Sequence, residues 1–320
     1  MLVNLGTPTS PDKKGLRPYL KQFLSDRRVI EASPLIWQPI LRGIILNTRP
    51  KKSAKAYAKI WRQESDESPL RYYTRRQAEA LQEVLGDGVQ VDYAMRYGAP
   101  SIEDKIDAMK KAGCERISIM ALYPQYSATT SASVYDEVFR TLLKLRWQPA
   151  VRTAAPWHDH PAYIEALAQS VTAHIDTLDW KPEVIIASFH GLPQAYFDKG
   201  DPYHCHCAKT ARLLREKLGM DETQLKLTFQ SRFGPTQWLQ PYTDKTVVEM
   251  AEAGTQKIAV VTPGFISDCV ETLEEIGLEL QAEFKQAGGT HFTTVPCLNE
   301  TPSSIDLLAT LAKRDLGGWQ

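Results

Sequence analysis

The stretch Val184-Ile185-Ile186-Ala187-Ser188-Phe189-His190-Gly191-Leu192-Pro193 decides the fold. Its apolar start predicts a buried strand, and Gly191 with Pro193 predicts a turn directly after it. A second apolar run, Ile258 to Val261, precedes an acidic segment that contains Glu271 and Glu275. Ligands of open parallel sheets bind outside the carboxyl ends of the strands. We therefore expect His190 and the acidic segment to meet in one crevice that handles protons or a metal.

Similar runs recur along the chain and alternate with helical patterns. The expected strands are Leu2–Gly6, Val89–Tyr97, Arg116–Tyr123, Val151–Ala155, Val184–His190, Lys226–Ser231, Lys257–Pro263 and Phe292–Leu298. The expected helices include Ile102–Ala112, Ser133–Leu145, Pro161–Leu178, Pro202–Leu218 and Thr243–Ala253. Alternation of this kind predicts parallel sheets flanked by helices. Four strands on either side of the midpoint indicate an α/β fold with two similar lobes, joined near residues 156–161.

Composition excludes several classes of protein. Lysine plus arginine equals aspartate plus glutamate, 38 each, which gives no general attraction for nucleic acid. The five cysteines have no regular spacing and no secretory leader is visible, so we expect reduced thiols and a cytoplasmic location. The first strand is followed by neither a dinucleotide-binding nor a phosphate-binding glycine motif.

The segment from about residue 30 to 62 combines apolar and basic residues. It has no acidic residue between Ala32 and Gln63, and its apolar part, Pro34 to Leu46, is too short to span a bilayer. One interpretation is an apolar lip over a ligand or on an anionic membrane surface. The alternative is a core-packed helix followed by a solvated basic helix.

His190 is the first candidate for chemistry. A neutral imidazole exchanges protons near neutral pH, and a loop at a strand end sits on a rigid scaffold. The alternative is a structural histidine that binds a backbone carbonyl.

The glutamates Glu271, Glu275 and Glu279 have i, i+4, i+8 spacing, which predicts an acidic ridge beside Glu274. The opposite stripe would face the core: Val270, Leu273, Gly277, Leu280 and Phe284. The ridge would attract cations and accept protons. In the alternative, Asp268 and Glu271 form a capping box at the start of a helix.

The run His204-Cys205-His206-Cys207 contains four potential metal ligands. Adjacent residues of one helix cannot easily surround an ion, and Asp201-Pro202 predicts the helix start. We expect Cys207 to lie in the core instead. Arg96, Tyr123 and Trp238 lie at or near strand ends, where they suit a large flat aromatic ligand with carboxylates.

Together these segments closely resemble the ferrochelatase family, whose members insert Fe²⁺ into a porphyrin. The resemblance rests on Val3-Asn4-Leu5-Gly6-Thr7-Pro8, Met95-Arg96-Tyr97, Tyr123-Pro124-Gln125-Tyr126-Ser127, Ser188-Phe189-His190-Gly191-Leu192-Pro193, Gly200-Asp201-Pro202-Tyr203 and Ser267-Asp268-Cys269-Val270-Glu271-Thr272-Leu273. It implies a lyase of haem biosynthesis with two Rossmann-like lobes. Residues 1–155 with 300–320 would form the first lobe, including the lip, and residues 156–299 the second, carrying His190 and Glu271.

The resemblance also implies roles for individual residues. His190 and Glu271 match the family's catalytic positions, and Glu275 continues the acidic line, so that all three are candidates to guide the metal. Arg96, Tyr123, Trp238 and Leu5 match positions at or near the porphyrin. At position 5, coproporphyrin-using relatives often carry a tyrosine, so Leu5 favours protoporphyrin IX as the substrate.

No resident cofactor is expected. Ala128 stands where animal members carry a cluster cysteine, so an animal-type [2Fe–2S] cluster is not expected. The family also implies peripheral contact with the inner membrane and with the preceding oxidase. Three alternatives remain: a coproporphyrin III ferrochelatase, a non-catalytic tetrapyrrole or metal carrier, and a chelatase of corrinoid precursors. A carrier would not need the pair of His190 and Glu271, so their presence favours an enzyme. The apolar lip favours a porphyrin over a corrinoid precursor with many carboxylates.

Overall fold

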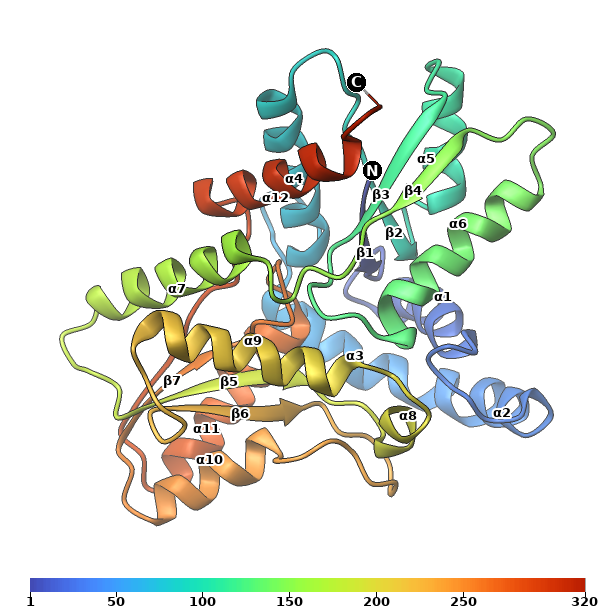
Figure 1. Cartoon of the computed structure of the whole chain (residues 1–320). Coiled ribbons are helices and arrows are strands. Elements are labelled where there is room, and N and C mark those ends of the chain that lie inside the picture. The colour runs from blue at the N-terminus through green and yellow to red at the C-terminus, as the bar shows by residue number, and fades with distance from the viewer. Residues whose placement is uncertain (320) are drawn as a thin grey trace. The chain divides into compact units, whose positions relative to one another are not determined.

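The structure, a computed structural model, describes residues 1–319 and divides into two units, each built on its own parallel four-stranded sheet (Figure 1). The first unit comprises Met1–Tyr123, Ser127–Ala155 and the C-terminal residues from Glu300. The second comprises Pro124–Tyr126 and Pro156–Asn299. Two parallel sheets flanked by helices confirm the predicted α/β fold.

The first unit has the strand order β2-β1-β3-β4, and all three pairings are parallel. The strands are β1 (Leu2–Gly6), β2 (Tyr93–Tyr97), β3 (Arg116–Ala121) and β4 (Ala150–Thr153). Strand β2 is shorter than predicted, because the side chain of Gln82 binds the backbone of Val89 and Val91. Those residues therefore bond to a helix side chain before the strand begins.

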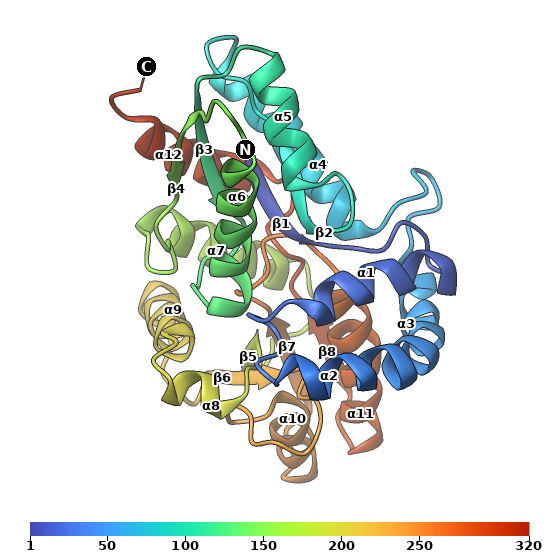
Figure 2. The same cartoon turned by 90° about the vertical axis from the view of Figure 1, so that its right-hand side faces the viewer.

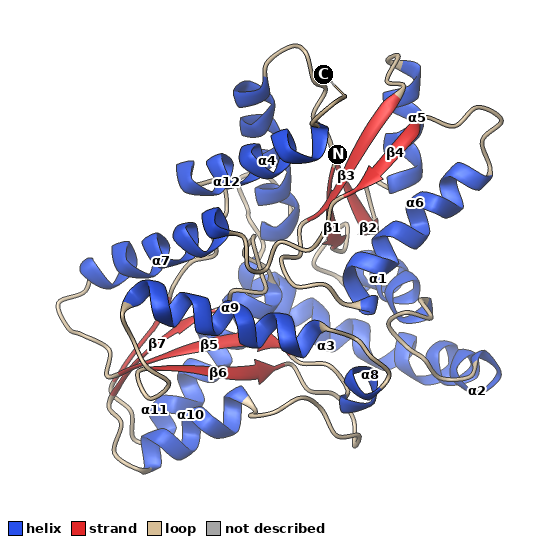
Figure 3. Cartoon of the chain, in the orientation of Figure 1, coloured by secondary structure: helices blue, strands red, loops and turns tan. Residues whose placement is uncertain are grey.

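Helices cover both faces of this sheet (Figures 2 and 3). On one face α5 (Ile102–Lys111) and α6 (Ser133–Leu143), preceded by the short π-helix η2 (Ala128–Ala132), pack on the apolar side chains of the strands. On the other face lie α4 (Pro69–Leu85) and α12 (Pro302–Leu316). Three of these helices begin with a hydroxyl cap, from Ser68, Ser101 and Thr301, which accepts a backbone N–H of the first turn.

The predicted lip segment, about residues 30–62, follows α1 (Lys13–Ser25) and forms a chain of helices: α2 (Pro34–Ile40), the π-helix η1 (Leu41–Ile45) and α3 (Leu46–Ile60). No residue of α2 is buried, and the side chains of Leu35 and Ile36 are 88% and 65% exposed. The alternative of a core-packed helix is therefore wrong for α2. Leu41 and Leu46 are buried and hold the segment in place.

The second unit has the strand order β6-β5-β7-β8, again with parallel pairings. The strands are β5 (Val184–His190), β6 (Leu225–Gln230), β7 (Lys257–Val261) and β8 (His291–Thr294). Helices α7 (Pro161–Asp176) and α9 (Tyr203–Leu218) lie on one face (Figure 1). On the other face α10 (Thr243–Glu252), the π-helix η3 (Glu271–Leu280) and α11 (Gln281–Gln286) share an apolar core with β5 and β7. The short helix α8 (Gln194–Asp198) follows the turn after β5.

All eight predicted strands are present. None of the helices within residues 1–319 has the length and apolar character needed to cross a bilayer.

Candidate functional site

His190 is the last residue of β5 and is half-buried. Its Nδ1 lies 2.7 Å from the carbonyl oxygen of Gly191. Because a carbonyl oxygen can only accept a hydrogen bond, Nδ1 carries the proton and donates. In the neutral ring the lone pair is then on Nε2, which is the atom that can act as a base. The bond to a backbone carbonyl is the structural role given as the alternative for His190, and the same tautomer leaves Nε2 as the ring's acceptor atom.

The turn after His190 is shaped by Gly191. A Cβ atom at this position would lie 2.7 Å from the carbonyl oxygen of Gln230 and 3.3 Å from Cε3 of Trp238. The indole therefore packs directly against the turn, and its Nε1 donates to the carbonyl oxygen of Phe233 at 2.8 Å. Trp238 is thus beside His190, and it places an aromatic wall at the end of β5.

Glu275 is held by side chains from the end of β6. The hydroxyl of Ser231 donates to its Oε2 at 2.6 Å, and Nε2 of Gln230 donates to the same oxygen at 3.3 Å. Gln230 also donates to the backbone carbonyl of Glu271 at 3.0 Å. Gln230 therefore ties both glutamates to the strand that pairs with β5.

Burial raises the pKa of Glu275 above its usual value. The carboxylate of Glu271 acts in the same direction, whereas the hydrogen bond from Ser231 and the positive charge of His190 in its protonated form oppose it. His190 and Glu271 therefore both lie near enough to Glu275 to act on its carboxylate.

The predicted acidic ridge is only partly correct, because η3 is a π-helix. Its i→i+5 bonding widens the turn, so a stripe drawn with 3.6 residues per turn drifts around the axis. Glu279 is exposed, whereas Glu274, which was expected beside the ridge, is 6% exposed. Of the predicted core stripe, Leu280 and Phe284 are buried, but Val270, Leu273 and Gly277 are only half-buried.

The alternative for Glu271, a capping box with Asp268, is wrong as well. No side chain caps η3, and Asp268 is bound elsewhere. Its Oδ1 accepts from the hydroxyl of Thr272 at 2.8 Å, and its Oδ2 accepts from Nδ2 of Asn299 at 2.7 Å. Asp268 therefore fastens the start of η3 to the loop after β8, which leaves the Glu271 side chain without a capping role.

The run from His204 to Cys207 is dispersed around α9. Cys207 is fully buried, which confirms the expected core position, and Cys205 is exposed. The ring of His204 packs near Phe197 and Phe229, and the ring of His206 stacks on His158. Within residues 1–319, no three His, Cys, Asp or Glu side chains converge closely enough to hold a metal ion.

Arg96 lies in the first unit, on β2, where it is almost fully paired. Its guanidinium forms an ion pair with Asp26 at 2.7 Å and donates to Ser133 at 2.8 Å. Tyr97 also donates to the carboxylate of Asp26, at 2.7 Å. Burial acts to raise the pKa of Asp26, but the hydroxyl of Ser133, which donates to its carboxylate at 2.6 Å, and the backbone N–H of Arg28 outweigh this effect. Together with the bond from Tyr97 and the Arg96 charge, they lower this pKa below its usual value.

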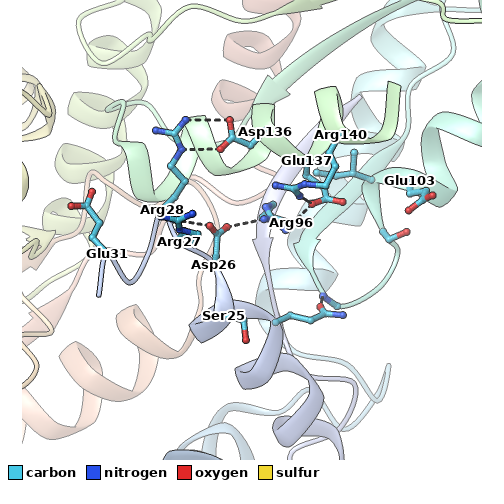
Figure 4. Close-up of a pocket in the computed structure, with 14 residues that line it drawn as sticks. Ser25, Asp26, Arg27, Arg28, Glu31, Arg96, Glu103, Asp136, Glu137 and Arg140 are labelled. Carbon is cyan, nitrogen blue, oxygen red and sulfur yellow. Dashed lines mark hydrogen bonds and ion pairs between the residues drawn. The ribbon is translucent and has the colours of Figure 1, made fainter. Parts of the chain in front are cut away.

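Arg96 and Asp26 line a charged pocket of about 960 Å³ (Figure 4). Around it, Arg28 pairs with Asp136 and Arg140 pairs with Glu137. Asp26 had no role in the sequence-based prediction. Gln230 and Ser231 had none either, although they stand at a predicted strand end, which is the signal that identified His190.

The two other candidates of the first unit are less distinctive. Tyr123 packs against the apolar core of that unit, and Leu5 is half-buried at the end of β1. The second unit thus assembles His190, Glu271, Glu275 and Trp238, while Arg96, Tyr123 and Leu5 belong to the first.

A family model described as ferrochelatase matches residues 1–316 of the chain. The chain belongs to the ferrochelatase family. Ferrochelatases of Rhizobium meliloti (strain 1021) and Agrobacterium fabrum (strain C58) are 57% and 58% identical to it. The alignments cover 100% of this chain and 95% and 93% of those two relatives. Membership confirms the predicted enzyme class, a lyase of haem biosynthesis that acts on iron and a porphyrin.

Solved structures support the chelatase fold. SirB from Bacillus subtilis with Fe³⁺ has a TM-score of 0.54 at 14% identity, covering 77% of this chain and 90% of that one. CbiX, described as the terminal enzyme for biosynthesis of sirohaem in denitrifying bacteria, has a TM-score of 0.52 at 13% identity, covering 99% and 98%. At these identities the likeness concerns the fold alone, and it agrees with the two parallel sheets of a ferrochelatase.

Proposed function

We propose that the chain inserts Fe²⁺ into protoporphyrin IX and releases two protons, with His190 as the general base. The observation that carries this proposal is the tautomer of His190. The carbonyl of Gly191 holds the proton on Nδ1, so Nε2 has a free lone pair at the end of β5. A pyrrole N–H must lose its proton before the nitrogen can bind iron, and a neutral imidazole is suited to accept it.

Glu271 and Glu275 then provide the next step for the proton or the approach for the metal. The raised pKa of Glu275 means that this carboxyl takes up a proton more readily than an ordinary glutamate. His190 and Glu271 both act on its charge, so a proton taken by His190 has an acceptor within the same cluster. Fe²⁺ is the substrate here, and we propose His190, Glu271 and Glu275 as side chains that guide it transiently.

Substrate contacts are proposed for Trp238, Tyr123, Arg96 and Leu5. Trp238 offers an aromatic surface beside His190, suited to a planar macrocycle. Arg96 would act through its place in the charged pocket, because its guanidinium already binds Asp26. Leu5 favours protoporphyrin IX, which has two carboxylates, over coproporphyrin III, which has four.

The exposed apolar face of α2 supports a peripheral membrane location. Leu35, Ile36 and Ile44 are exposed, and Arg42, Lys51, Lys52, Lys55 and Lys59 follow as exposed basic residues. Apolar side chains beside basic ones bind anionic lipid surfaces. We propose that α2 and η1 rest on the cytoplasmic face of the inner membrane, where an apolar porphyrin can pass from the preceding oxidase.

The test is anaerobic incubation of the purified protein with Fe²⁺ and protoporphyrin IX, followed by the Soret and visible bands. We expect catalytic conversion to the haem spectrum, loss of turnover in His190→Ala, and retained porphyrin binding in that variant. His291→Ala, which changes an exposed histidine of β8, is the matched control and should turn over normally. Near-normal turnover by His190→Ala would refute the proposed base. Turnover with coproporphyrin III alone would replace the substrate.

A further inference from the structure

Two histidines of the second unit stack on each other away from the cluster of His190. His158 precedes α7 and His206 lies in the first turn of α9. Their ring centroids are 3.6 Å apart, and the planes differ by 7°. His158 is 8% exposed, and its Nδ1 is buried without a hydrogen-bond partner. An unsatisfied buried nitrogen costs free energy.

The other ring of the pair, His206, binds the backbone of a neighbouring segment. Its Nδ1 lies 3.2 Å from the backbone nitrogen of Tyr126 and accepts that N–H. Nδ1 must therefore be unprotonated, and the stack on His158 fixes the ring in the orientation that the bond needs. A histidine with a proton on Nδ1 has no lone pair there for the Tyr126 amide.

Tyr126 belongs to a three-residue segment of the second unit, and the residues before and after this segment belong to the first unit. Pro124–Tyr126 is part of the second unit, whereas Tyr123 and Ser127 are part of the first. Three successive bonds hold the segment. Trp157 donates to the carbonyl of Pro124 at 3.1 Å, Gln125 donates to Thr210 at 3.0 Å, and Tyr126 donates to His206.

The same side chains hold His158 in place. The hydroxyl of Thr210, which receives the Gln125 amide, donates to the carbonyl of His158 at 2.8 Å. Gln125 and Thr210 are buried, so these bonds are shielded from water. The stacked pair and the segment Pro124–Tyr126 therefore form one connected polar network.

Burial keeps both rings neutral, whereas the charged groups around the pair act in both directions. Burial lowers the pKa of His158 to about 4, with a further contribution from His206, and burial also lowers the pKa of His206. Lys209 opposes protonation of both rings, whereas Asp159, which pairs with Lys209 at 2.6 Å, favours it. Asp201 favours protonation of His206 as well. The neutral rings are the forms that preserve the bond to Tyr126.

We propose that His206 is a positioning residue. Stacked on His158, it holds the Tyr126 amide and so sets the conformation of the segment Pro124–Tyr126, which directly follows Tyr123, a proposed porphyrin contact. This inference rests on the proposed function for its consequence, porphyrin binding, but the anchor itself stands on the geometry of the second unit.

The first measurement is hydrogen exchange at the Tyr126 amide, followed by mass spectrometry on overlapping peptides. His206→Ala removes the acceptor, and loss of one hydrogen bond should speed exchange roughly two- to tenfold. His206→Asn places an oxygen acceptor near the position of Nδ1 and should restore much of the protection. Cys205→Ser, on the same turn of α9 with an exposed side chain, is the matched control. Unchanged exchange in His206→Ala would overturn the proposal.

The second measurement is the steady-state rate with protoporphyrin IX. In His206→Ala the KM for porphyrin should rise roughly two- to tenfold at an unchanged kcat, and His206→Asn should reverse most of the rise. A purely structural role would lower the amount of active enzyme without this separation. His158→Phe keeps a stacking ring and removes the unpartnered nitrogen, so its KM should stay normal.

The outcomes separate the two proposals. Faster exchange without a change in KM would overturn the role in substrate positioning. A wild-type protein that converts no porphyrin would refute the proposed function and with it the substrate role, while the exchange data would still decide whether His206 anchors Tyr126.

Discussion

Removing the hydroxyl of Ser231 should move the acidic limb of the pH profile of metallation to higher pH. This hydroxyl donates to Oε2 of Glu275 at 2.6 Å, and a hydrogen bond to a carboxylate favours its charged form. In Ser231→Ala the pKa of Glu275, which burial already raises, rises further. The proposed reaction needs the ionised cluster, so kcat/KM should fall at low pH and recover at a higher pH than in the wild type.

The size follows from the strength of the lost bond. Hydrogen bonds to charged groups contribute about 1.5–3 kcal/mol, and 1.36 kcal/mol corresponds to one pH unit, so the acidic limb should move up by roughly one to two units. Gln230 still donates to the same oxygen, at the longer distance of 3.3 Å, which favours the lower end of that range. The assay is kcat/KM for Fe²⁺ insertion measured anaerobically across a pH series.

Two variants distinguish the effect of losing the Ser231 hydroxyl from an effect on the backbone at that position. Ser231 has φ = +63°, in the left-handed region, so Ser231→Gly removes the hydroxyl while relieving any backbone strain. Both variants should show the same shift. In a Glu275→Gln background, Ser231→Ala should shift nothing further, because the titrating group is gone. A folded Ser231→Ala protein with an unmoved acidic limb would refute the assignment of Glu275 to the titrating cluster.

Three further predictions concern the frame around the site. Gly191→Ala should cost about 1–3 kcal/mol in urea unfolding, because its Cβ would lie 2.7 Å from the Gln230 carbonyl, whereas Gly264→Ala, with 3.6 Å to its nearest neighbour, should cost much less. Asp26→Asn should lower the free energy of unfolding by about 3 kcal/mol, the lower end for a broken buried pair, because Arg96 keeps only its longer pair with Glu137 at 3.5 Å. Asp136→Asn, in an exposed pair, should cost less than about 1 kcal/mol. The pKa of Asp26 is lower in the folded than in the unfolded protein, where it is about 3.9. Asp26 therefore stabilises the fold above about pH 3.9, and this stabilisation is lost as the pH falls through the folded-state pKa. The free energy of unfolding should accordingly fall more steeply in acid for the wild type than for Asp26→Asn. The double variant Leu35→Ser with Ile36→Ser should no longer sediment with anionic vesicles, while its free energy of unfolding stays unchanged. Leu143→Ser, which changes a similarly exposed residue outside the lip, should still sediment. Vesicle binding by the double variant would contradict the membrane proposal.

The strands could be predicted from the sequence because the central ones, β1, β5 and β7, are buried on both faces and therefore read as short apolar runs. Val184–His190 is predicted and observed with the same ends. The cluster of His190 with Glu271 and Glu275 could also be predicted, since parallel strands β5 and β7 are neighbours and end at the same edge.

The remaining features depend on contacts that local sequence does not encode. The π-helical turn of η3 moves Glu274 inward and Leu273 outward, and nothing in the spacing of the residues distinguishes it from an α-helix. Asp26 meets Arg96 across 70 positions of the chain, and Asp268 meets Asn299 across 31. Pairs of this kind are set by the tertiary fold, which brings loops together after the strands are in place.

The protonation of His190 and that of Glu275 are controlled by different kinds of group, one in the backbone and the other in side chains. The tautomer of His190 is set by a backbone carbonyl, that of Gly191, which side-chain substitutions elsewhere do not remove. The charge of Glu275 is set by side chains, the hydroxyl of Ser231 and the amide of Gln230. Substitutions at those two positions should therefore change the pH at which the site works while leaving the base intact. Changes near Gly191 should act through the shape of the turn, and so reduce activity at every pH.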